Sequence, residues 1–143
     1  MGPAVIVLAL VSLVVPFAAA RRHAQPSPPG TPVNVLLDDF HVRRTNAVVP
    51  AGMVRFELVN NGPSTHEFIV VRSDRASDKL PLQRDGLTVD EEGPGVDDVD
   101  EAEGLDIADR RTLTLDLAPG HYVLFCNMEG HYLGGMHAAF TVR

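Results

Sequence analysis

The sequence predicts an all-β protein, a β-sandwich, and three observations support this fold class. Apolar and polar residues alternate with a period of two in several short stretches, which is the pattern of half-buried strands. Glycine, proline and asparagine residues, which favour turns, separate these stretches. Beyond the N-terminal apolar run, no stretch keeps a helical period over three turns. The chain has 143 residues, enough for one domain of this class.

The N-terminal run over residues 2–20 is apolar and uncharged, and it ends in three alanines. Small residues at that position are typical of a signal-peptidase cleavage site, but roughly 19 apolar residues are also just enough to span a bilayer. We therefore expect residues 1–20 to be a signal peptide or a membrane anchor. Both alternatives export the domain that follows, to the periplasm or the outer face of the membrane. Residues 21–32 contain four prolines and are expected to be an extended linker.

The domain itself is expected to span residues 33–143, and the alternation places its strands. The clearest example runs from Val54 to Leu58, where every second residue is apolar. The predicted strands cover residues 33–42, 54–58, 66–72, 112–117, 122–126 and 136–142. Turn signals stand between them, such as Asn-Asn-Gly-Pro at 60–63 and Pro-Gly at 119–120.

Residues 73–110 form an acidic segment that interrupts this pattern. They hold 13 of the 19 acidic residues and four basic ones, which gives the segment a net charge of −9 and the rest of the chain +2. The composition favours a solvated loop inserted between two strands, and the alternative is a docking surface for a basic partner. An EF-hand calcium loop starting at Asp98 is disfavoured, because position 103 is Glu where that loop needs Gly.

The overall charge and the cysteine count exclude two further classes. The net charge of −7 argues against non-specific nucleic-acid binding, so we expect no nucleic-acid partner. The chain has a single cysteine, so it cannot form an intramolecular disulfide. A free thiol in an exported protein is unusual and calls for a chemical role.

The single cysteine belongs to a spacing that suits a metal site. Cys126, His131 and Met136 follow one another as C-x4-H-x4-M, and His66 opens an apolar strand upstream. One thiolate, two imidazoles and a weak thioether are the donors of a blue copper site. Strand parity directs His66, Cys126 and Met136 inward, while His131 lies in a glycine-bounded loop. We therefore predict one copper ion, bound by His66, Cys126, His131 and Met136.

Three other donors fit this pattern less well. His137 has the opposite strand parity to Met136 and should face outward. Met128 is only two residues from the cysteine, too close for both sulfurs to reach one ion in the expected geometry. Glu67 would supply an oxygen, which favours harder metals than copper in this setting.

With these motifs the sequence resembles the cupredoxins, the family of plastocyanin, azurin and auracyanin. The Asn- and Gly-rich turn before His66, the Pro-Gly-x-Tyr sequence at 119–122 and the auracyanin-like C-x4-H-x4-M spacing carry the resemblance. It implies a Greek-key β-sandwich with a type 1 copper site over residues 33–143, with the acidic segment as an insertion. Glu67 stands where the family commonly has Asn or Asp, a position to which a hydrogen bond beside the copper site is usually ascribed.

The expected function is one-electron transport outside the cytoplasm by a protein that is not an enzyme. Copper enzymes of this kind need additional clustered histidines, and the six histidines here include no His-x-His pair. Electrons are expected to enter and leave at the edge of His131. Residues 132–135 would form a flat patch around it on which a redox partner docks. The carrier is expected to be a monomer. The alternative is a copper chaperone or storage protein that delivers copper to an exported cuproenzyme. Such proteins usually bind Cu(I) through exposed Met and His or paired Cys.

Overall fold

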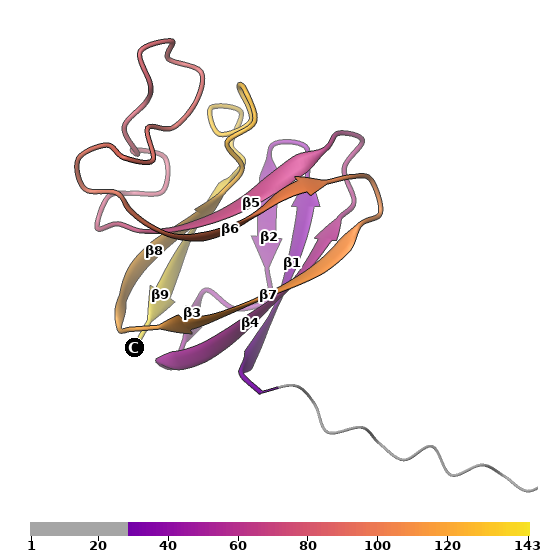
Figure 1. Ribbon diagram of the computed structural model, residues 1–143, viewed down its shortest axis with the longest axis vertical. Coiled ribbons are helices and arrows are strands. Elements are labelled where there is room, and N and C mark those ends of the chain that lie inside the picture. The colour runs from indigo at the N-terminus through magenta and orange to yellow at the C-terminus, as the bar shows by residue number, and fades with distance from the viewer. Residues whose placement is uncertain (1–28) are drawn as a thin grey trace, which may run out of the picture.

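The computed structural model describes residues 29–143 of the chain (Figure 1). The predicted signal peptide or anchor, and all but the end of the predicted linker, lie outside the described residues. Within residues 29–143 the chain forms nine strands. No helix in that part of the chain is long and apolar enough to cross a membrane. The all-β prediction is confirmed.

The strands form two mixed sheets that pack face to face (Figure 1). The four-stranded sheet has the order β2 (His41–Arg44), β1 (Thr31–Asp38), β4 (Gly52–Asn60) and β7 (Arg110–Leu117). The five-stranded sheet has the order β3 (Val48–Val49), β9 (His137–Val142), β8 (Gly120–Phe125), β5 (His66–Arg72) and β6 (Asp97–Leu105). The β1–β4 and β3–β9 pairs are parallel and the others are antiparallel. The predicted β-sandwich is therefore confirmed.

The core between the sheets follows the predicted alternation. Phe56 of β4 packs against Phe68 of β5 and Phe140 of β9, with ring centroids 5.3 and 5.4 Å apart. Burying each such side chain contributes about 1.5–3 kcal/mol. The inward-facing rows of β5, β8 and β9 end at the same end of the sandwich. Their last members are His66, Cys126 and Met136, all fully buried.

The first predicted strand, residues 33–42, is wrong in one respect, because the structure divides it into β1 and β2. Asp39 and Phe40 form the turn between these antiparallel strands, and Phe40 has a φ of 64°. Phenylalanine seldom adopts this left-handed conformation, so the sequence carries no turn signal at this point. Strand β1 also begins two residues before the predicted strand, since Thr31 and Pro32 already pair with β4.

The acidic segment differs from the solvated loop that its composition favours. Residues 97–105 form the edge strand β6, which pairs with β5. Residues 73–96, which we call the capping loop, bury Leu80, Val89 and Val96 in a second core on the outer face of the five-stranded sheet. In Figure 1 this loop lies beside the yellow loop between β8 and β9. Apolar residues spaced among acidic ones thus hold much of the segment against the domain.

Candidate metal centre

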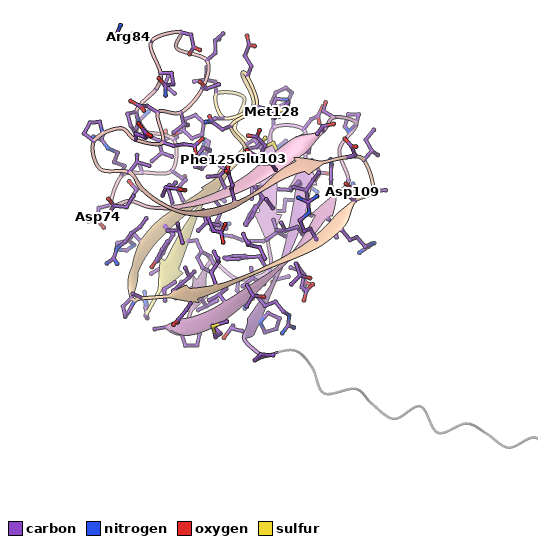
Figure 2. All side chains as sticks on the ribbon, in the orientation of Figure 1. Asp74, Arg84, Glu103, Asp109, Phe125 and Met128 are labelled. Atoms are coloured by element: carbon purple, nitrogen blue, oxygen red, sulfur yellow. The ribbon has the colours of Figure 1, made fainter. Side chains whose placement is uncertain are left out.

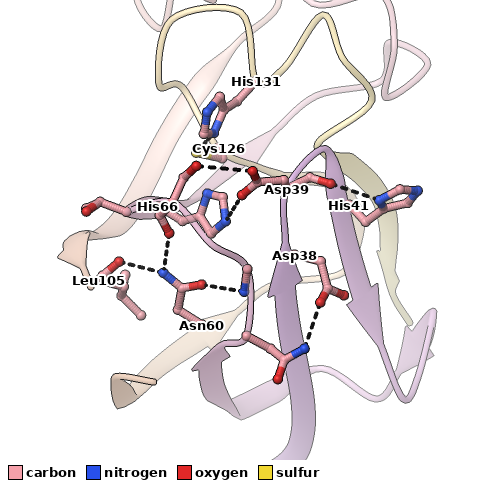
Figure 3. Close-up of polar contacts among 12 residues, drawn as sticks. Asp38, Asp39, His41, Asn60, His66, Leu105, Cys126 and His131 are labelled. Carbon is pink, nitrogen blue, oxygen red and sulfur yellow. Dashed lines mark hydrogen bonds and ion pairs between the residues drawn. The ribbon is translucent and has the colours of Figure 1, made fainter. Parts of the chain in front are cut away.

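Three of the four predicted ligands form a compact cluster at one end of the sandwich (Figure 3). His66, Cys126 and His131 each offer a donor atom, and these atoms lie within 4.8 Å of one another. The Sγ atom of Cys126 is 3.5 Å from Nδ1 of His131. The two imidazole rings have their centroids 5.2 Å apart. The cluster is shielded from water on the side of His66 and Cys126, which are fully buried, while His131 is partly exposed.

The loop between β8 and β9, residues 126–136, brings three of the predicted ligands together, and we call it the ligand loop. Its ends are joined by a hydrogen bond from the amide of Cys126 to the carbonyl of Met136, 3.1 Å long. The amide of Met136 donates in turn to the carbonyl of His131 at 3.0 Å. These bonds fold the loop back on itself, so that the fully buried Met136 lies next to the cluster.

The surroundings of Cys126 favour the neutral thiol over the thiolate that binds a metal. Burial raises the pKa of the Cys126 thiol, although the backbone amide of Glu67 donates to Sγ at 3.4 Å and opposes this effect. A coordinated cation deprotonates a thiol outright, so a bound metal would overcome the raised pKa. This hydrogen bond comes from the backbone amide. It therefore does not depend on the side chain at position 67, where Glu67 replaces the Asn or Asp that is common in the family.

His66 presents one nitrogen to the cluster and the other to a carboxylate. Both ring nitrogens are buried and make no hydrogen bond of good geometry, but Nε2 lies 3.2 Å from Oδ1 of Asp39, which is ion-pair distance. Burial lowers the pKa of His66 and the neighbouring His131 lowers it further, while Asp39 opposes both. A neutral imidazole with an unpartnered nitrogen is the form that binds a metal. This observation and the thiol beside it fit a copper ion.

The turn before His66 is organised by residues that the sequence marked only as turn formers. The side-chain amide of the fully buried Asn60 donates to the carbonyls of Ser64 and Leu105, both at 2.8 Å. Its Oδ1 accepts from the amide of Gly62 at 2.9 Å. A Cβ at position 62 would lie 2.7 Å from Nε2 of His66, so only glycine fits there. Asn60, Gly62 and Asp39 were missed as contributors to the site. For the first two, the Asn-Asn-Gly-Pro sequence was the available signal.

The surface beside His131 is apolar in part, but it is built from other residues than the 132–135 patch predicted from the sequence. Leu133 is 51% exposed, and Phe40 of the β1–β2 turn adds a second apolar side chain, 44% exposed. The Phe40 ring meets the edge of His131 at 5.6 Å between centroids and packs on Gly134. Tyr132, however, is buried, so it does not belong to the patch. Its hydroxyl donates to the carbonyl of Ser77 and accepts from the amide of Leu80 in the capping loop.

Two of the donors that we disfavoured, His137 and Glu67, lie outside the cluster. His137 faces the other side of the sheet from Met136, as its parity predicts, and its ring packs on Tyr132 at 5.1 Å. Met128 is partly buried against the main core. The Glu67 carboxyl group is not part of the cluster, and burial raises its pKa, with Glu103 adding to the effect.

A family model described as the sulfocyanin (SoxE) domain matches residues 43–143, which is most of the chain. The chain belongs to the sulfocyanin family. Sulfocyanin is a cupredoxin, so the resemblance seen in the sequence motifs is confirmed. No curated protein matches the chain by sequence.

Solved structures of cupredoxins share the fold of this sulfocyanin-family domain. Auracyanin B is 26% identical, with a TM-score of 0.59 over 81% of this chain and 91% of that chain. Auracyanin from the photosynthetic bacterium Roseiflexus castenholzii is 20% identical, with a TM-score of 0.56 over 81% of this chain and 99% of that chain. Reduced rusticyanin is 18% identical, with a TM-score of 0.54 over 81% of this chain and 82% of that chain. The predicted cupredoxin sandwich is thereby confirmed.

Proposed function

We propose that this protein binds one copper ion at the His–Cys–His cluster and carries single electrons outside the cytoplasm. The observation that carries the proposal is the convergence of a buried thiol with two imidazoles within 4.8 Å. His66, Cys126 and His131 would bind the copper ion, and the buried thioether of Met136 would be a further, weaker donor. When bound, copper supplies one-electron oxidation and reduction.

The residues around the cluster suit a carrier because they fix the ligands before any electron arrives. His66 is held by β5 and the turn that Asn60 organises, and Cys126 and Met136 continue β8 and β9. Ligands held by paired strands move little when the charge on the metal changes. Burial of His66, Cys126 and Met136 also excludes water from that side of the site.

His131 would be the route by which electrons enter and leave. Its ring is the partly exposed member of the cluster, and exposed Phe40 and Leu133 lie beside it. A small apolar patch of this kind suits the brief contacts of redox partners. We propose that a redox protein docks there on the monomer. Export rests on residues 2–20, which have the composition of a signal peptide or anchor.

The burial of the sulfur donors favours a carrier over the two alternatives. Chaperones and storage proteins offer exposed Met and His or paired Cys, whereas Cys126 and Met136 are fully buried here. An enzyme would need a substrate cavity at the metal. A groove of about 710 Å³ lies on the outer face of the four-stranded sheet, and none of the four proposed ligands lines it.

A copper titration followed by visible and EPR spectroscopy tests the proposal. We expect one copper per chain, a strong thiolate-to-copper absorption band and reversible reduction by one electron. Cys126→Ser should abolish the band, while Met128→Leu, a sulfur change two residues away, should leave it intact. A Cys126→Ser protein that keeps the wild-type colour would refute the site. Colourless binding of Cu(I) alone, with transfer to an acceptor, would establish the chaperone function instead.

A further inference from the structure

The β1–β2 turn brings a carboxylate to a buried imidazole. Nε2 of His66 lies 3.2 Å from Oδ1 of Asp39, and neither atom makes a hydrogen bond elsewhere among the described residues (Figure 3). The other carboxylate oxygen of Asp39 accepts from the hydroxyl of Ser64 at 3.1 Å. Ser64 belongs to the turn that leads into β5. The carboxylate is therefore attached both to the histidine and to the turn that positions it.

The surroundings leave this carboxylate little freedom. A Cβ at Gly62 would lie 2.9 Å from Oδ1 of Asp39 and 2.7 Å from Nε2 of His66, so the chain at position 62 closes over the pair. On the other side, the neighbouring residue Phe40 is seated on Gly134 and against the His131 ring. The turn is thus anchored to the ligand loop, which keeps the backbone of Asp39 beside His66.

A carboxylate at Nε2 determines which nitrogen of the imidazole is free. A neutral imidazole has one proton, and the negative oxygen favours that proton on Nε2. The lone pair is then on Nδ1, a buried nitrogen with neither a hydrogen bond nor a carboxylate beside it among the described residues. In metalloproteins such a partner on the far nitrogen fixes the tautomer and ring orientation and makes the histidine a stronger donor.

We propose that Asp39 is a positioning residue of the copper site. It holds His66 with the Nδ1 lone pair toward the metal, and its negative charge favours Cu(II) over Cu(I), which lowers the reduction potential. This inference rests on the proposed function, because it requires His66 to be a copper ligand.

The test compares Asp39→Asn, which removes the charge and keeps the shape, with the wild-type protein. Loss of such a partner commonly costs about 10-fold or more in metal affinity. We expect the ratio of Cu(II) to Cu(I) affinity to fall about tenfold, which raises the potential by about 59 mV for one electron, with the visible band retained. The matched control is Asp106→Asn, which removes the same charge from a carboxylate that contacts Thr65 instead of His66. The ratio should change less than twofold there.

Nitrogen NMR of the copper-free protein gives a reading that does not depend on copper or on the folding of a variant. In the wild type we expect His66 to have its proton on Nε2 and none on Nδ1, and Asp39→Asn should populate both tautomers. A wild-type His66 with its proton on Nδ1 would overturn the inference. So would a blue Asp39→Asn protein with an unchanged affinity ratio. A wild-type protein that shows no blue band would refute the proposed function instead, which separates the two failures.

Discussion

The ligand loop and the capping loop lie against each other, yet they are built in different ways. The ligand loop is closed by its own backbone bonds between Cys126, His131 and Met136, and both its ends continue into neighbouring strands. The capping loop is held by contacts with residues that are distant in sequence. A site encoded by local spacing can therefore be recognised from sequence. A segment that is stabilised by scattered tertiary contacts has a sequence like that of a solvated loop, so its packing cannot be recognised in this way.

The two loops are joined at residues that flank the metal cluster. The Asn127 side chain accepts from the amide of Val89 at 2.6 Å and donates to its carbonyl at 3.1 Å and to Glu91 at 2.6 Å. The amide of Gly130, next to His131, donates to the carbonyl of Leu87 at 3.1 Å. The capping loop thus braces the ligand loop without contributing a ligand.

The largest expected effect comes from removing the core of the capping loop. Leu80→Ala deletes a buried side chain, which should lower the free energy of unfolding by about 2–5 kcal/mol. Denaturant unfolding of the copper-free protein measures it. Leu82→Ala is the matched control, because Leu82 is exposed in the same loop and should change stability by about 0.5 kcal/mol or less. Equal effects of the two variants would show that the capping loop is solvated after all.

The link between the loops should matter somewhat less. Asn127→Ala removes three hydrogen bonds and is expected to cost about 1–3 kcal/mol of stability. Copper should also dissociate faster, since the ligand loop loses its brace, while the colour stays. Stopped-flow transfer of copper to a chelator measures the rate. Gln83→Ala, which removes one exposed bond to Asp90, is the control and should leave the rate unchanged. An unaltered rate in Asn127→Ala would mean that the ligand loop holds its shape alone.

Within the ligand loop, the two methionines should differ. Met136→Leu removes the proposed axial donor, which destabilises Cu(II) more than Cu(I). The reduction potential should rise by about 59 mV or more, a tenfold change in relative affinity. Met128→Leu should leave the potential unchanged. Voltammetry of both proteins decides, and the opposite result would exchange their roles.

The smallest effect is expected from the charges of β6. Its exposed carboxylates lie on the edge strand of the five-stranded sheet, where none belongs to the metal cluster. Replacing Asp97, Asp98 and Asp100 with Asn should change the rate of oxidation by a small cationic oxidant less than twofold at 0.1 M salt, where screening acts over about 10 Å. A salt series on the wild type and the triple variant measures it. A salt-dependent rate that disappears in the variant would show that the acidic segment steers basic partners.

Much of the fold was predictable because half-buried strands alternate, and the predicted strand at residues 112–117 lies within the alternating β7. The convergence of His66, Cys126 and His131 was predictable because soft donors at a fixed spacing are rarely accidental. The β1–β2 turn was not, since Phe40 adopts a conformation that its side chain does not favour. The burial of Tyr132 was also not predictable, because its hydrogen-bond partners lie in a loop more than 50 residues away in sequence.

The β1–β2 turn has a mechanical consequence for the protein as a whole. His66 opens β5 and the other three proposed ligands lie in the ligand loop, so the four-stranded sheet supplies no ligand and reaches the site through Asn60, Asp39 and Phe40. Sliding one sheet over the other would therefore alter the distance from Asp39 to His66. A substitution far away in the core, such as Phe56→Leu, would then be expected to shift the reduction potential of the proposed copper site. The reduction potential of the proposed copper site would then report on how the two sheets pack against each other.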